Sequence, residues 1–278
     1  MAHITAGNDA AGHPVNIFYE DWGQGAPVVL IHGWPLDHTM WEHQAMALAT
    51  AGHRVIAYDR RGFGRSSRPW SGYDYDTLAA DLNALLTELD LNKVTLVGFS
   101  MGGGEVARYL SRYGDARVAR AVFVSAVTPF LLQTNDNPDG VPASVFQGML
   151  DGIAKDRFDF LSGFAKHFYG VGVISKPVSQ AVLDWNQTVT TLAAPNATAE
   201  CVRSFSGTDF RADLQAIKIP TLVIHGDADQ TVPIEYSGAR AAKMIPGAEY
   251  KVYKGEPHGL FFTSKDELSH DLLAFMAK

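Results

Sequence analysis

Apolar runs and amphipathic stretches alternate along the first part of the chain. The apolar runs carry hydrophobic side chains at nearly every position, which is typical of strands buried on both faces of a parallel sheet. The stretches between them repeat hydrophobic residues at helical spacing, as Leu78, Leu82 and Leu85 do. Strand–helix alternation of this kind predicts a doubly wound α/β sheet. The predicted strands are 15–21, 27–31, 54–58, 94–97 and 118–124, and the predicted helices are 41–51, 76–89 and 105–113.

The alternation is interrupted once, in the second half of the chain. The interrupting segment has no long buried strand and holds helical fragments that are rich in phenylalanine and punctuated by proline. An insertion of this kind predicts a cap over the carboxyl ends of the strands, where open α/β sheets bind ligands. We therefore expect a core of residues 1–127 and 216–278 and a helical cap at 128–215. The later strands are expected at 221–225 and 249–253, and the later helices at 234–244 and 265–276.

The composition narrows the class of protein. Of the 278 residues 46% are hydrophobic, as in a globular protein with a full core, and the net charge of −7 argues against nucleic acid or an anionic membrane as the main partner. Cys201 is the single cysteine, which excludes an internal disulfide and a cysteine metal cluster. The N-terminus lacks the apolar core of a signal peptide, and no apolar stretch is long enough to span a bilayer. We expect a soluble, cytoplasmic protein.

A short glycine-rich segment follows the apolar run at 94–97. Residues 98–102 read Gly-Phe-Ser-Met-Gly and fit G-x-S-x-G, the nucleophile elbow, with Ser100 at its centre. A serine on so tight a strand-to-helix turn has a strained backbone, and glycines on both sides let the strand and the helix approach. The turn places the serine Oγ at the N-terminus of a helix, where the helix dipole favours negative charge. Because short motifs also match by accident, the rest of the chain has to supply a base and an acid.

Two late loops supply both partners. Asp229 lies in the loop after the strand at 221–225, and His258 lies between Pro257 and Gly259 after the last strand. The resulting order Ser, Asp, His is that of α/β-hydrolases, and all three loops belong at the same edge of the sheet. Asp227 is a second candidate acid, but Asp229 lies further from the strand, where its carboxylate can face a neighbouring loop. The alternative is that both aspartates only form the turn.

A tetrahedral oxyanion needs two donors that are already in place. The backbone N–H of Met101, directly after the nucleophile, is one candidate, and the N–H of Trp34, in the loop after the strand at 27–31, is the other. Pro35 has no N–H, biases Trp34 towards an extended conformation and stiffens this loop. An ordinary turn proline is an equally good interpretation of Pro35.

Other chemistries find little support in the sequence. Zinc or iron would need clustered His, Asp and Glu ligands, and no such set stands out, so we expect no metal and no other cofactor. The glycines at 102–104 lack the Gly-Lys-Ser/Thr of a phosphate loop and the register of a dinucleotide fingerprint. We interpret the arginine-containing loop at 59–66 as structural, and His32 and His225 as packed residues beside strand ends.

Taken together, these segments resemble the cofactor-free bacterial haloperoxidases, a family close to aryl esterases and some γ-lactamases. The resemblance implies an α/β-hydrolase fold with a mostly parallel eight-stranded sheet, helices on both faces and an inserted helical cap. It also implies a Ser100–Asp229–His258 triad, no metal or haem, and a homo-oligomer. One departure is Phe99, because many members have histidine before the nucleophile. The resemblance rests on 32–35 (His-Gly-Trp-Pro), 59–67, 98–105, 225–230 (His-Gly-Asp-Ala-Asp-Gln) and 257–260, and extends through the cap.

The expected activity is hydrolysis of small carboxylic or aryl esters through an acyl-enzyme. Hydrogen peroxide in place of water would give a peracid, which oxidises chloride or bromide in solution without a cofactor. One alternative is a γ-lactamase or lactone hydrolase that uses the same triad, and another is a non-catalytic binding protein on this scaffold. The residues expected to enclose the substrate are Trp34, Pro35, Phe99, Val127, Phe146, Phe164, Phe168, Thr231 and Val232.

Overall fold

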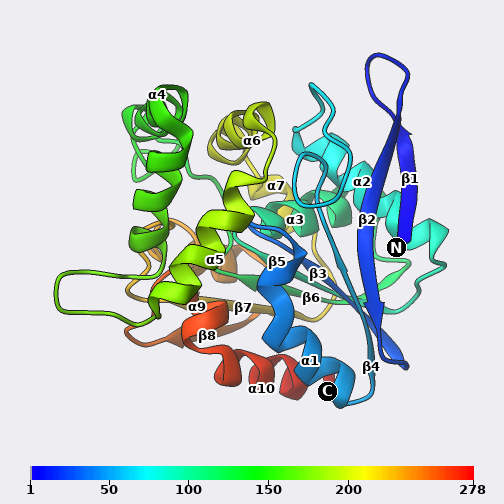
Figure 1. The fold of residues 1–278 in the computed structure, drawn as a ribbon. Coiled ribbons are helices and arrows are strands. Elements are labelled where there is room, and N and C mark those ends of the chain that lie inside the picture. Colours follow the sequence, from blue (N-terminus) through cyan, green and yellow to red (C-terminus); the bar gives the residue numbers. More distant parts are fainter. Residues whose placement is uncertain (1) are drawn as a thin grey trace.

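The computed structural model describes residues 2–278. Within that range the chain forms an eight-stranded sheet with helices on both faces (Figure 1), as the sequence predicts. The strands are β1 (Ala2–Asn8), β2 (Pro14–Trp22), β3 (Ala26–Ile31), β4 (His53–Tyr58), β5 (Val94–Phe99), β6 (Val118–Val124), β7 (Thr221–Gly226) and β8 (Glu249–Tyr253).

The helices include one 3₁₀ turn, η1, directly before α1. They are η1 (His38–Trp41), α1 (Glu42–Thr50), α2 (Tyr75–Glu88), α3 (Met101–Tyr113), α4 (Ala143–Phe168), α5 (Gln180–Thr191), α6 (Pro195–Gly207), α7 (Arg211–Gln215), α8 (Gly238–Met244), α9 (Leu260–Thr263) and α10 (Lys265–Met276).

The sheet has the strand order β1-β2-β4-β3-β5-β6-β7-β8. All pairs from β4 to β8 are parallel, whereas β2 runs antiparallel to both β4 and β1. A hydrophobic core covers each face of the sheet, and neighbouring residues of β3 belong to different cores. Val29 belongs to the core that includes residues of α2 and α3, and Leu30 to the core that includes residues of α1 and α10. The central strands are therefore buried on both faces, which explains their unbroken apolar runs.

Two elements differ from the prediction. The sequence predicts no strand before residue 15, yet β1 pairs with β2 at the sheet edge. In β1 only Ile4 is buried, so the strand lacks the hydrophobic signal of the central strands. The helix expected from residue 234 begins only at Gly238, because residues 234–237 form turns in which Ile234 O accepts the N–H of Ala239.

Helices α4 to α7 lie between β6 and β7 in the chain, and α4 and α6 stand above the sheet in Figure 1. They cover the carboxyl end of β3, because Trp34 packs against Phe164 of α4 and Phe205 of α6. Helix α4 is kinked at Asp156, whose φ is −158° and whose Oδ1 accepts the N–H groups of Phe158 and Asp159. The kink gives the two halves of α4 different directions.

No helix within residues 2–278 combines the length and the apolar character needed to cross a membrane.

A buried ion pair joins α3 to the loop after β4. Arg60 and Glu105 are each about 1% exposed, and Arg60 Nε donates to Glu105 Oε1 at 2.5 Å. The Tyr58 hydroxyl donates to Glu105 Oε2 at 2.6 Å, and Arg60 Nη2 donates to the His32 carbonyl at 2.6 Å. The loops after β3 and β4 are thereby held to helix α3 in one hydrogen-bonded arrangement.

Glu105→Ala should destabilise the fold strongly, because it leaves the Arg60 guanidinium buried without a counter-charge. We expect the free energy of unfolding in urea to fall by about 3–5 kcal/mol. The control is Glu200→Ala, which breaks an exposed pair with Arg203 and should cost less than about 1 kcal/mol. Equal losses in the two variants would contradict this account.

Candidate active site

Ser100 occupies the junction of β5 and α3. Its φ of +52° lies in a region that non-glycine residues rarely adopt, and its side chain is almost fully buried. A Cβ on Gly98 would overlap the backbone of Gly102, and a Cβ on Gly102 would lie 2.5 Å from the Ile31 carbonyl. The glycine spacing of the motif is therefore a steric requirement of this turn.

The structure brings Ser100, His258 and Asp229 into one hydrogen-bonded series. His258 Nε2 lies 3.0 Å from Ser100 Oγ, and His258 Nδ1 lies 2.6 Å from Asp229 Oδ2. All three side chains are buried, although they come from loops after three different strands. The arrangement has the order nucleophile, base and orienting carboxylate that acyl transfer requires.

Asp229 is surrounded by donors. Its Oδ1 accepts the backbone N–H groups of Thr231 and Val232 at 2.9 and 2.8 Å. Its Oδ2 faces His258 and also lies 3.2 Å from Nε2 of His225. Burial alone would raise the pKa of Asp229, but the two imidazoles and their hydrogen bonds hold it well below the usual value. The carboxylate thus stays ionised beside His258.

The remaining predicted candidates have structural roles. Asp227 Oδ1 accepts the N–H of Gly255 at 2.5 Å and so joins two loops without reaching His258. His225 is buried as expected, but it also faces Asp229, a contact that its strand-end position does not reveal. His32 Nε2 accepts the N–H of Arg60 at 2.9 Å, and burial together with the Arg60 charge lowers the pKa of His32 well below its usual value.

The loop after β3 presents its amide groups beside the nucleophile. A Cβ on Gly33 would lie 2.5 Å from the Phe99 ring and 3.1 Å from the Ser100 Cβ, so the loop passes close to the elbow. Within residues 2–278 neither the Trp34 amide nor the Met101 amide donates to a protein acceptor. The indole Nε1 of Trp34 donates to Thr198 O of α6 at 3.0 Å, which fixes the loop against the cap. The peptide bond between Trp34 and Pro35 is cis.

A cavity of about 490 Å³ opens over Ser100 and His258. Its walls are mainly apolar side chains from α4, α6 and the loops after β3 and β6. An apolar cavity of this size with a nucleophile at its floor fits a small organic substrate. The predicted pocket residues that line it are Trp34, Val127, Phe146, Phe164, Thr231 and Val232.

Of the predicted pocket residues, Pro35, Phe99 and Phe168 do not line this cavity. Phe99 is the last residue of β5 and is fully buried. Because successive strand residues point to opposite faces of the sheet, Phe99 lies on the same face as Val97, where both pack with residues of α1 and α10. Its ring and that of Phe168 each lie 4.9 Å from the His258 ring, so both phenylalanines support the imidazole from behind. Pro35 is buried in the loop after β3.

Several cavity residues escape prediction from sequence. On the second half of α4, Asp159, Gly163 and His167 recur every four residues and face the cavity. Helical spacing groups these positions, but only the packing of α4 over the sheet decides that this face lines the cavity. The other unpredicted lining residues are Leu131, Val141, Val145, Met149, Phe160, Phe205 and Gln230.

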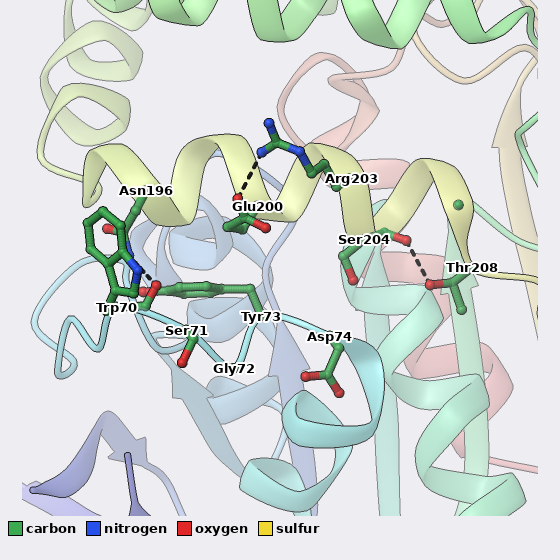
Figure 2. A pocket seen from close by; sticks show the side chains of 11 residues that line it. Trp70, Ser71, Gly72, Tyr73, Asp74, Asn196, Glu200, Arg203, Ser204 and Thr208 are labelled. Atoms are coloured by element: carbon green, nitrogen blue, oxygen red, sulfur yellow. Dashed lines mark hydrogen bonds and ion pairs between the residues drawn. The ribbon is translucent and has the colours of Figure 1, made fainter. Parts of the chain in front are cut away.

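A larger groove of about 650 Å³ lies on the outer side of α6 (Figure 2). Figure 2 shows Glu200, Arg203 and Ser204 of α6 above a loop that carries Trp70 and Tyr73. Asn196 Nδ2 donates to the carbonyls of Pro69 and Trp70 and so connects the two walls. None of Ser100, Asp229 and His258 lines this groove, whereas Ser100 and His258 line the apolar cavity described above.

One further cluster could hold a metal ion within the described residues 2–278. The carboxylates of Asp37 and Asp59 and the imidazole of His38 are buried close together, a set that the sequence does not suggest because Asp59 is distant in the chain. Their atoms are already engaged: His38 Nδ1 lies 2.6 Å from Asp59 Oδ1, and Asp37 Oδ1 accepts the N–H of Thr39 at 2.9 Å. Hydrogen bonding within the protein accounts for the cluster.

Comparison with known proteins shows to which family the chain belongs. The family model described as alpha/beta hydrolase fold matches residues 26–265. The chain is 47% identical to the non-heme chloroperoxidase CPO-A1 of Kitasatospora aureofaciens, over 95% of this chain and 97% of that protein. It is 40% identical to a bifunctional esterase/perhydrolase of Acinetobacter calcoaceticus, over 94% and 96% of the two chains. The crystal structure of a bromoperoxidase from Bacillus anthracis superposes with a TM-score of 0.96 at 47% identity, covering 100% of this chain and 99% of that one.

The lowered pKa of Asp229 predicts a pH-dependent contribution to stability. Above the usual carboxyl pKa of 3.8 the contribution is complete, and it is lost as the pH falls towards the lower folded-state value. We expect the difference in unfolding free energy between wild type and Asp229→Asn to shrink from pH about 6 to about 3 in urea titrations. Asp227→Asn controls for the charge change, and a pH-independent difference for Asp229→Asn would contradict the assignment.

Proposed function

The chain belongs to the alpha/beta hydrolase fold family, and from that premise we propose that it is a serine hydrolase with Ser100 as nucleophile. His258 acts as general base, and Asp229 orients the imidazole and stabilises its charged form. The observation that carries the proposal is the unbroken series from Ser100 Oγ through His258 to Asp229 Oδ2, with contacts of 3.0 and 2.6 Å. This series lies at the floor of an apolar cavity.

The reaction proceeds in two halves. His258 Nε2 takes the Ser100 proton as Oγ attacks the ester carbonyl, and the amides of Trp34 and Met101 stabilise the oxyanion. His258 then protonates the leaving alcohol, and the acyl group remains on Ser100. In the second half His258 activates the acyl acceptor, which releases the acid. The ionised Asp229 stabilises the imidazolium in both halves.

Hydrogen peroxide as acceptor gives a peracid in place of the carboxylic acid. The relatives named chloroperoxidase and esterase/perhydrolase, at 47% and 40% identity, support this second activity. The peracid oxidises bromide or chloride after it leaves the protein, so halide oxidation needs no halide site. The apolar walls of the 490 Å³ cavity favour small carboxylic or aryl esters as acyl donors.

Ser100→Ala tests the nucleophile. The variant lacks the atom that forms the acyl-enzyme, so we expect kcat for p-nitrophenyl acetate to fall by at least about 10⁴-fold. A fluorophosphonate probe should label the wild type at Ser100 and leave the variant unlabelled. Ser204→Ala, on the outer groove side of α6, is the control and should retain activity and labelling. Hydrolysis that persists in Ser100→Ala would refute the mechanism.

Halide oxidation should depend on the same serine. We expect bromination of an indicator dye to require peroxide, bromide and an ester together, and to disappear in Ser100→Ala. Peracid should accumulate when bromide is left out, because perhydrolysis precedes the halide step. Bromination by Ser100→Ala at the wild-type rate would show that oxidation does not pass through the acyl-enzyme.

A further inference from the structure

A second cavity adjoins the active site. It has a volume of about 470 Å³ and is formed by the segment that follows α4, the loop after β7 and the loop after β8. We call it the side cavity. His167 and Gln230 line both the side cavity and the active-site cavity. These two residues therefore belong to the walls of both spaces.

A hydrogen bond links these two shared residues, and we call this contact the partition. His167 Nε2 lies 3.2 Å from the backbone carbonyl of Gln230. Gln230 directly follows Asp229, and the next two amides, of Thr231 and Val232, hold the Asp229 carboxylate. The partition thus involves the residue that directly follows the acid of the triad.

The two cavities differ in chemistry. Apolar side chains of α4 and α6 dominate the active-site cavity. The side cavity is lined by glycines, by Ser175 and by Glu256, so backbone and polar groups make up much of its surface. A small polar molecule finds hydrogen-bonding partners along the side cavity that it lacks among the phenylalanines of α4.

We propose that the side cavity is an access path for the polar acyl acceptor, water or peroxide, and that His167 and Gln230 gate it. The proposal rests on the function proposed above. Once Ser100 is acylated, an apolar acyl chain occupies the cavity beneath α4 and obstructs entry from that direction. An acceptor that comes past His167 arrives on the His258 side of the acyl carbonyl, where its proton has to go.

The step served by this path is deacylation. The acceptor oxygen attacks the acyl carbonyl while its proton passes to His258 Nε2. The bond between the carbonyl carbon and Ser100 Oγ then breaks, and Oγ takes the proton back from His258. Water gives a carboxylic acid and peroxide gives a peracid, while the serine is regenerated.

The side cavity can be filled without touching the triad. A Cβ on Gly172 meets no atom within 4 Å, and Ser175 lines the same space. Gly172→Phe and Ser175→Phe therefore narrow the path from two positions. Val173→Phe is the matched control, because Val173 lies in the same loop, is 98% exposed and does not line the cavity. His167→Ala removes the partition and acts in the opposite direction.

The experiment is rapid-mixing kinetics with p-nitrophenyl hexanoate, with and without peroxide. Acylation should be unchanged in Gly172→Phe, Ser175→Phe and Val173→Phe, as seen from the rate of the p-nitrophenol burst. Deacylation should fall about fivefold in Gly172→Phe and Ser175→Phe, which corresponds to a barrier about 1 kcal/mol higher. The KM for peroxide should rise in the same two variants, whereas His167→Ala should speed deacylation and Val173→Phe should match the wild type.

The outcomes separate this inference from the proposed function. If Gly172→Phe and Ser175→Phe both deacylate like Val173→Phe, the acceptor does not use the side cavity and the inference is overturned. A fall in the burst rate together with deacylation would also overturn it, since a general disturbance of the site explains that result. The absence of any burst in the wild type, with Ser100 unlabelled by the probe, would instead refute the acyl-enzyme mechanism.

Discussion

The turn at Ser100 is the constraint on which the rest of the site depends. A non-glycine residue at φ +52° costs on the order of 1–3 kcal/mol, so the surroundings must hold it. They do so from three sides: Ser100 N donates to Val124 O, and Ser100 O accepts from Gly103 N and Val127 N. Strand β6 and helix α3 thereby define the position of Oγ. The glycines are needed because backbone atoms occupy the space where side chains would lie.

Buried charges extend this rigidity to the neighbouring loops. The pair of Arg60 and Glu105 joins the nucleophile helix α3 to the loop after β4, and Arg60 also bonds the His32 carbonyl at the end of β3. Asp229 is held by two backbone amides and faces two imidazoles. Groups that are fixed before the substrate arrives need no reorganisation when charge develops on the carbonyl oxygen, which is the main electrostatic advantage of such sites.

The triad residues and much of the cavity wall come from different parts of the chain. In the proposed mechanism the loops after the strands supply the nucleophile, base, acid and free amides, whereas α4 supplies a large part of the apolar walls of the cavity. The two parts are joined where Trp34 packs on Phe164 and Phe205 and bonds Thr198 O. In the proposed mechanism, changes in α4 and α6 can therefore alter which acyl group fits without moving the reacting atoms. His167 and Gln230 also line the side cavity, whose walls are more polar.

The sequence by itself determined the central strands, the elbow and the order Ser, Asp, His, because periodicity and turn chemistry are local properties that residues a few positions apart encode. It missed β1, whose exposed edge position leaves it without an apolar pattern. Only the tertiary structure decided which phenylalanines face the substrate. Phe99 packs in the core with residues of α1 and α10, whereas Phe160 of α4 lines the cavity. The contact between His167 and Gln230 joins residues 63 positions apart and likewise depends on long-range packing that no local pattern records.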